Sequence, residues 1–161
     1  MSVEIERKFR LPEAPDWLSS CGNSQRIEHG YLAIEPGTGA EVRLRRRDGQ
    51  LLLTVKRGSG RTRTEEEIEL EPEQFDALWP LTEGRRVEKV RYVVPTDTGE
   101  IEVDVFEGAL TGMITAEMEF DTEATSDAFE PADWLGAEVT GDERYANEML
   151  AVHGLPQEGE R

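Results

Sequence analysis

The chain has 161 residues, of which 33% are charged, and a formal net charge of −17. One domain of this size can build a core without disulfides, and the single cysteine, Cys21, excludes an intramolecular one. The acidic balance argues against nucleic acid as a partner, and no apolar run reaches the roughly 20 residues of a membrane span. We therefore expect a cytoplasmic protein with one domain over residues 1–155 and a tail at 156–161. The sequence does not decide between a monomer and a homodimer.

Period-two alternation of apolar and polar residues dominates the chain and predicts strands. In chain order they lie at about 3–10, 26–34, 40–47, 50–57, 63–70, 86–94, 99–107 and 114–121. Asp48-Gly49, between the third and fourth of these, is a strong hairpin signal. Helices are predicted at about 13–20 and 72–80 and in parts of 125–135 and 141–153. We expect an α+β fold.

The polar faces of these strands carry charged residues of both signs. In 114–121, for example, Glu117 and Glu119 oppose Met118 and Phe120. One interpretation is an antiparallel sheet with one buried and one solvated face. The other is a closed eight-stranded barrel, flanked by helices, whose charged faces line the interior. Because unpaired buried charge is costly, such a lumen makes sense only if a charged ligand fills it.

The spacing of the charged residues indicates which ligand. Glu4-x-Glu6-x-Lys8 places two carboxylates and an ammonium on one face, about 6.5–7 Å between neighbours. The same spacing recurs in Glu117-x-Glu119, Glu102-x-Asp104, Arg63-x-Glu65-x-Glu67, Arg43-x-Arg45 and Lys89-x-Arg91. Carboxylates hold hard divalent cations, and Lys and Arg hold phosphate oxygens. The combination is what a complex of metal and polyphosphate requires.

With these motifs the chain resembles the CYTH-domain proteins of the triphosphate tunnel metalloenzymes. The resemblance is carried by the N-terminal MSVEIERKFRL with its ExExK signature, and by later motifs that follow in order: Gly30-Tyr31-Leu32, Val42-Arg43-Leu44-Arg45, Thr54-Val55-Lys56, Glu117-Met118-Glu119-Phe120 and 138–147. Leu78-Trp79-Pro80 and 83–89 look most like the short bacterial inorganic triphosphatases. The resemblance implies an eight-stranded tunnel, a C-terminal helix near one mouth, and one or two Mg²⁺ or Mn²⁺ ions.

The resemblance also implies roles for individual residues. The expected metal ligands are Glu4, Glu6, Glu117, Glu119 and Asp104. The expected catalytic residues, which would hold a second metal or the attacking water, are Glu65, Glu67, Glu102 and Asp104, together with Lys56. The expected phosphate-binding residues are Lys8, Tyr31, Arg43, Arg45, Lys56, Arg63, Lys89, Arg91 and Arg144. The implied reaction is metal-dependent hydrolysis of inorganic triphosphate to pyrophosphate and phosphate.

Other functions are open on the same fold. An adenylate cyclase, or a thiamine or nucleoside triphosphatase, would need room for an organic group, and the sequence shows no clear aromatic cluster for one. A non-catalytic polyphosphate-binding module is the alternative of a different class. The two histidines, His29 and His153, are too few and too isolated to predict a metal cluster. Tyr145 and Asn147 are interpreted either as a helix anchor or as substrate contacts.

Overall fold

The computed structural model describes residues 5–57 and 64–157. Two of the predicted site residues, Glu4 and Arg63, therefore lie outside the described residues. Of the strand predicted at 3–10, the part from Ile5 onward is described, and it is extended as expected.

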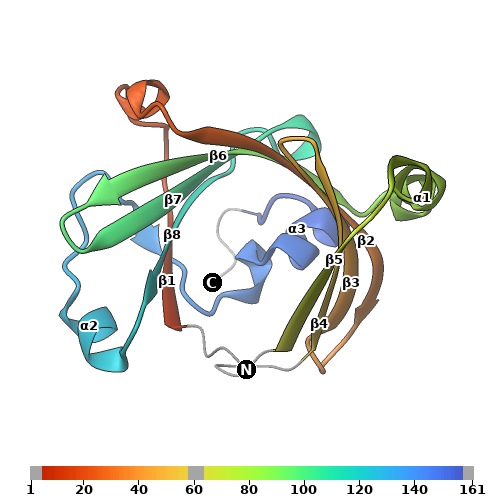
Figure 1. The fold of residues 1–161 in the computed structure, drawn as a ribbon. Coiled ribbons are helices and arrows are strands. Elements are labelled where there is room, and N and C mark those ends of the chain that lie inside the picture. The colour runs from red at the N-terminus through yellow and green to blue at the C-terminus, as the bar shows by residue number, and fades with distance from the viewer. Residues whose placement is uncertain (1–4, 58–63, 158–161) are drawn as a thin grey trace.

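The described strands form one antiparallel sheet that curves around the C-terminal helix (Figure 1). In sequence order they are β1 (Ile5–Arg10), β2 (Ser24–Glu35), β3 (Ala40–Arg47), β4 (Gln50–Arg57), β5 (Thr64–Glu69), β6 (Arg86–Thr96), β7 (Gly99–Phe106), β8 (Ile114–Phe120) and β9 (Ala137–Glu138). Their order across the sheet is β5-β4-β3-β2-β6-β7-β8-β1-β9. All eight predicted strands are present, and β9 is an addition that the sequence pattern did not predict.

The prediction of a closed eight-stranded barrel is wrong for the described residues: the sheet has nine strands and is open. Closure would require β5 to pair with β1. That edge of β1 is taken by β9, which pairs Phe9 with Glu138 and Arg10 with Ala137. Gly136 permits this close approach, since a Cβ there would stand 2.0 Å from the backbone oxygen of Arg10. At the other end, every residue of β5 is exposed, and its charged side chains suit an unpaired edge.

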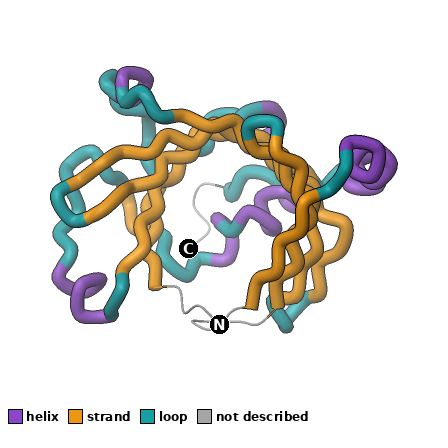
Figure 2. Tube along the Cα trace, in the orientation of Figure 1, coloured by secondary structure: helices purple, strands orange, loops and turns teal. Residues whose placement is uncertain are grey.

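The helices are short and lie around and within the curved sheet (Figure 2). They are α1 (Pro72–Leu78), α2 (Glu123–Ala128) and α3 (Asn147–His153), with 3₁₀ turns at Leu18–Ser20, Trp79–Thr82, Gly108–Leu110 and Glu143–Tyr145. The helix predicted at 13–20 is reduced to its last turn, because Pro15 disfavours the helical conformation of the preceding Ala14. No helix in the described part of the chain is long and apolar enough to cross a membrane.

The main core lies on the convex face of the sheet. Phe9, Val103 and Ala116, from β1, β7 and β8, pack with Leu18 and Leu135 in one buried cluster. Arg7, in β1, is on this side of the sheet and holds the segment that covers it. Its guanidinium donates to the carbonyls of Ser126 and Phe129 and to Glu138. The other half of the convex face is covered by α1 and the turn after it.

The concave face is different, because α3 lies within its curve (Figure 1) and ionisable side chains line a cavity there. A second apolar cluster anchors α3 there, in which Tyr145 and Leu150 pack with Val87, Phe106 and Met113. The sheet and this helix together position the side chains of the candidate site.

Candidate active site

The concave face encloses a cavity of about 570 Å³. Among the described residues its lining holds eight glutamates and five Lys or Arg side chains: Glu6, Glu41, Glu65, Glu100, Glu102, Glu117, Glu119, Glu148, Lys8, Arg43, Arg45, Lys56 and Arg91. An excess of carboxylates over cations in an enclosed space is unfavourable by itself. The described cavity is therefore suited to bind cations as well as an anion.

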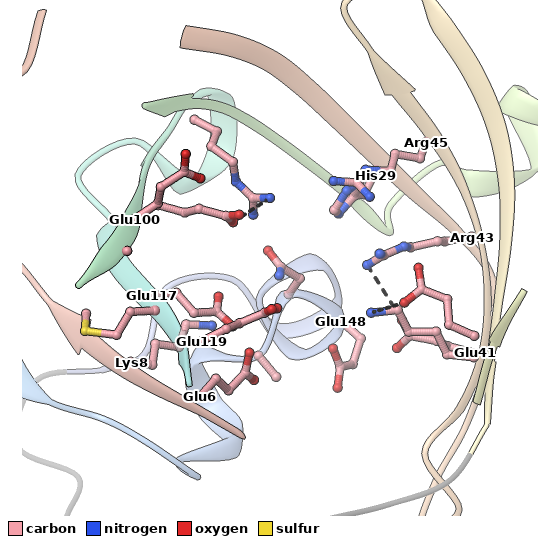
Figure 3. A pocket seen from close by; sticks show the side chains of 18 residues that line it. Glu6, Lys8, His29, Glu41, Arg43, Arg45, Glu100, Glu117, Glu119 and Glu148 are labelled. Carbon is pink, nitrogen blue, oxygen red and sulfur yellow. Dashed lines mark ion pairs between the residues drawn. The ribbon is translucent and has the colours of Figure 1, made fainter. Parts of the chain in front are cut away.

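Most of the carboxylates stand on one wall, built from β1, β7 and β8 (Figure 3). The strand register puts Glu6 directly opposite Glu119 and Glu102 directly opposite Glu117. Like charges in directly opposed positions destabilise a sheet unless a counter-ion intervenes. Lys8, opposite Glu117, supplies part of that compensation, and its Nζ donates to the carbonyl of Tyr145 at 2.7 Å.

Two carboxyl groups of this wall have pKa values that are shifted in opposite directions. Burial opposes ionisation of Glu117, but a hydrogen bond with Glu6 and the charge of Lys8 outweigh it and lower the pKa of Glu117. Burial raises the pKa of Glu102, helped by Asp104 and Glu117, although Arg91 opposes the shift. The wall thus combines Glu117, whose ionised form is favoured, with Glu102, which takes up a proton more readily.

The opposite wall is cationic and comes mainly from β3, where Arg43 and Arg45 point into the cavity (Figure 3). Burial and the neighbouring guanidinium groups lower the pKa of Arg45 to about 10. Within the described residues, the Nε atoms of both arginines are buried without a hydrogen-bond partner. Tyr31 is not among the residues that line the cavity, and its hydroxyl interacts with Arg43. Tyr31 is fully buried opposite Arg43, and burial raises its pKa, so it remains a neutral hydroxyl. Buried donors without partners favour an anionic ligand.

Asp104 connects β7 to two cations of β6. Its Oδ1 lies 2.8 Å from Arg91 Nε, and its Oδ2 lies 2.7 Å from Lys89 Nζ. Burial lowers the pKa of Lys89 to about 8, although Asp104 partly opposes this. Of the three residues only Arg91 lines the cavity, where its Nη1 also pairs with Glu102 at 2.8 Å. The structure thus places Lys89 and Asp104 behind the wall, where Asp104 fixes Arg91.

A further group of predicted residues lies where β4 pairs with β5. Lys56 and Glu65 are opposed across the strands, with 3.8 Å between Nζ and Oε2, and both line the cavity. Glu67 is not among the lining residues: it accepts a hydrogen bond from Thr54 at 2.8 Å and lies 3.9 Å from Arg45. Glu67 is thus placed to orient Arg45 from behind.

Arg144 is placed away from the cavity lining in the described structure. Its guanidinium forms two hydrogen bonds with Asp142, at 3.0 and 2.7 Å, just before α3. Residues 146–148 of this segment do line the cavity, and among them the Oδ1 of Asn147 accepts a hydrogen bond from Lys89 Nζ at 3.0 Å. Asn147 therefore links the start of α3 to the cations of β6.

Sequence reasoning missed four ionisable lining residues, His29, Glu41, Glu100 and Glu148. Glu41 lies two residues before Arg43, and His29 lies two residues before Tyr31. The period-two alternation therefore places each of them on the same side of its strand as the predicted residue that follows it. Glu148 gave no such signal, because only the tertiary position of α3 brings it to the cavity.

The geometry of an acidic wall facing a cationic wall agrees with the sequence resemblance. A comparison with known families shows to which family the chain belongs. The model of the CYTH domain matches residues 2–145. The chain belongs to the CYTH domain family.

Relatives within this CYTH family are similar over nearly their whole length. An inorganic triphosphatase of Nitrosomonas europaea is 42% identical over 151 residues, which are 93% of this chain and 97% of that protein. An inorganic triphosphatase of Acetivibrio thermocellus is 36% identical over 152 residues, covering 93% and 94%. A crystal structure of an inorganic triphosphatase superposes with a TM-score of 0.75 at 40% identity, covering 97% of this chain and 99% of that one. The resemblance to the bacterial triphosphatases is confirmed.

Proposed function

We propose that this protein hydrolyses inorganic triphosphate to pyrophosphate and phosphate with the help of Mg²⁺ or Mn²⁺. The observation that carries the proposal is the arrangement of the cavity: opposed glutamates on one wall, and two buried arginines whose Nε atoms have no hydrogen-bond partner in the described residues on the other. Similarity to two inorganic triphosphatases supports the choice of reaction.

The residues present fit a divalent cation. The hydrogen bond between Glu117 and Glu6 shows two carboxyl groups in contact, and Glu119 lies opposite Glu6. Within the described residues no three acidic, histidine or cysteine side chains enclose an ion by themselves. Mg²⁺ suits such a site, because it is usually held by one or two carboxylates together with water and substrate phosphate oxygens. When bound, the ion would neutralise charge on the phosphates and favour attack by water.

The protein's own groups bind and orient the phosphate chain. Arg43, Arg45 and Arg91 would contact its oxygens, and Lys8 and Lys56 would add charge from the neighbouring strands. Because these groups are fixed by the sheet, they stabilise developing charge without reorganising. Glu102, with its raised pKa, is the carboxylate best placed to orient the attacking water and accept its proton. Asp104 and Glu67 would act from behind by holding Arg91 and Arg45.

Inorganic triphosphate is favoured over ATP because it carries ionised phosphate at both ends and can engage the whole cationic wall. Replacing one terminal oxygen by an adenosyl ester removes one charge-assisted contact, worth about 1.5–3 kcal/mol, or about one to two decades in kcat/KM. Pyrophosphate is too short to reach every cation. We therefore expect it to be a poor substrate or a product inhibitor.

The decisive experiment measures phosphate release from tripolyphosphate, ATP, thiamine triphosphate and pyrophosphate with Mg²⁺, Mn²⁺ or Ca²⁺, with cyclic AMP measured in parallel. The expected result is the highest kcat/KM for tripolyphosphate. A preference for ATP or thiamine triphosphate would favour an organic triphosphatase, and cyclic AMP as the main product would favour a cyclase. Tight binding of tripolyphosphate without turnover under any metal would favour a binding module.

A further inference from the structure

His29 is a feature of the cavity that the proposed mechanism does not use. It lies in β2, opposite Arg45 on β3 and Val87 on β6, and its side chain is 2% exposed. Its imidazole stands on the cationic wall beside Arg45, among the residues that line the cavity (Figure 3).

Neither ring nitrogen of His29 has a hydrogen-bond partner in the described part of the chain. A buried polar group without a partner is costly, so a fixed, unpaired imidazole on a cavity wall indicates a ligand. Burial, reinforced by Arg43, Lys89, Arg45 and Arg91, lowers its pKa well below the ordinary value. The imidazole is therefore neutral and offers one N–H donor and one acceptor. A divalent cation is an unsuitable ligand here because four cationic side chains surround the ring.

We infer that His29 contacts the phosphate chain of the bound substrate as a neutral hydrogen-bond donor. The inference rests on the proposed function for the identity of the ligand as a triphosphate. A neutral donor suits this position, since it adds a directed hydrogen bond to a phosphate oxygen without adding charge to a wall already crowded with guanidinium groups. Because β2 is paired on both sides, the backbone fixes the direction of that bond.

Two variants separate this role from simple packing. His29→Gln keeps an N–H donor in a side chain of similar reach, and His29→Leu removes it while filling much of the space. We expect His29→Leu to raise KM for tripolyphosphate about ten- to a hundredfold, as for loss of a hydrogen bond to a charged group. His29→Gln should stay within about threefold of the native protein. The exposed His153, at the end of α3, gives the matched control His153→Leu, which should leave KM unchanged.

The stability of the ligand-free protein distinguishes a binding group from a structural one. Because His29 makes no hydrogen bond within the described residues, His29→Leu should leave the urea midpoint of unfolding unchanged or higher. A structural histidine would lose stability when replaced. Added tripolyphosphate should raise the melting temperature of the native protein more than that of His29→Leu.

A spectroscopic measurement tests the contact directly. In protein labelled with ¹⁵N-histidine, tripolyphosphate added in the presence of EDTA should shift the ring nitrogens of His29 and leave those of His153 in place. An unchanged KM in His29→Leu, or unmoved His29 resonances at saturating tripolyphosphate, would overturn the inference. If the resonances shift but no metal supports phosphate release, the proposed hydrolysis fails while the contact stands. If the protein hydrolyses tripolyphosphate and His29 does not respond, only the inference about His29 fails.

Discussion

Lys89 and Asp104 form an ion pair in nearly complete burial, with 2.7 Å between Nζ and Oδ2. Asp104 at the same time binds Arg91, which reaches the cavity. The carboxylate of Asp104 therefore pairs with two cations, Lys89 and Arg91. The three side chains do not contribute equally to the stability of the fold. Removing Asp104 leaves two buried positive charges, whereas removing Lys89 leaves a matched pair.

The first prediction follows from this asymmetry. Asp104→Asn should lower the free energy of unfolding by about 3 to 5 kcal/mol, since it leaves the buried Lys89 without its counter-charge and Arg91 with Glu102 alone. Lys89→Met should cost clearly less, because the apolar side chain fills the space and Asp104 keeps Arg91. Urea unfolding of both variants at neutral pH measures the difference. Equal losses of unfolding free energy in the two variants would show that Asp104 does not stabilise both Lys89 and Arg91.

The second prediction concerns acid stability. Burial alone would raise the pKa of Asp104, but Lys89 and Arg91 lower it from 3.8 to about 2. The folded state then binds fewer protons than the unfolded state between these two pH values. The contribution of Asp104, about 2 kcal/mol, is present above pH 3.8 and is lost as the pH falls toward 2. Urea midpoints between pH 7 and pH 2 should show this decline, and the ¹³C carboxyl signal of Asp104 should not titrate above about pH 3.

The third prediction concerns the acidic wall. Glu119→Gln removes one of two opposed carboxylates and should lower kcat/KM about a hundredfold or more if the pair holds the divalent cation. EDTA should abolish turnover of the native protein, and Mg²⁺ or Mn²⁺ should restore it. Glu73→Gln, an exposed glutamate on α1, is the control and should behave as the native protein does. Full activity in metal-free buffer would contradict the proposed mechanism.

The fourth prediction concerns the cationic wall. Arg45→Ala should raise KM for tripolyphosphate about ten- to a hundredfold through loss of a charged contact, with a smaller effect on kcat. Relief of repulsion with Arg43 and Arg91 should keep the variant folded. Arg57→Ala, at the exposed end of β4, is the matched control. Steady-state kinetics at saturating Mg²⁺ compare them, and an unchanged KM in Arg45→Ala would mean that Arg45 does not contact the substrate.

Much of the fold could be predicted from local pattern. The period-two alternation placed all eight long strands within a few residues of their described bounds, because side chains of a strand point to alternate faces wherever it lies. The Asp48-Gly49 hairpin is also local: both residues have positive φ, 47° and 84°, as its turn requires. The same alternation put Arg43, Arg45, Glu117 and Glu119 on the cavity side of their strands.

The sequence by itself thus determined the strands, their faces and the pairing of charged residues along each strand, because these depend on backbone geometry over a few residues. Only the tertiary structure decided which charges reach the cavity. Asp104 and Lys89 have the right spacing but neutralise each other behind the wall, since the register of β6 and β7 brings them together. The open edge of the sheet and the place of His29 beside Arg45 likewise depend on contacts between segments distant in sequence, and no local pattern carries that information.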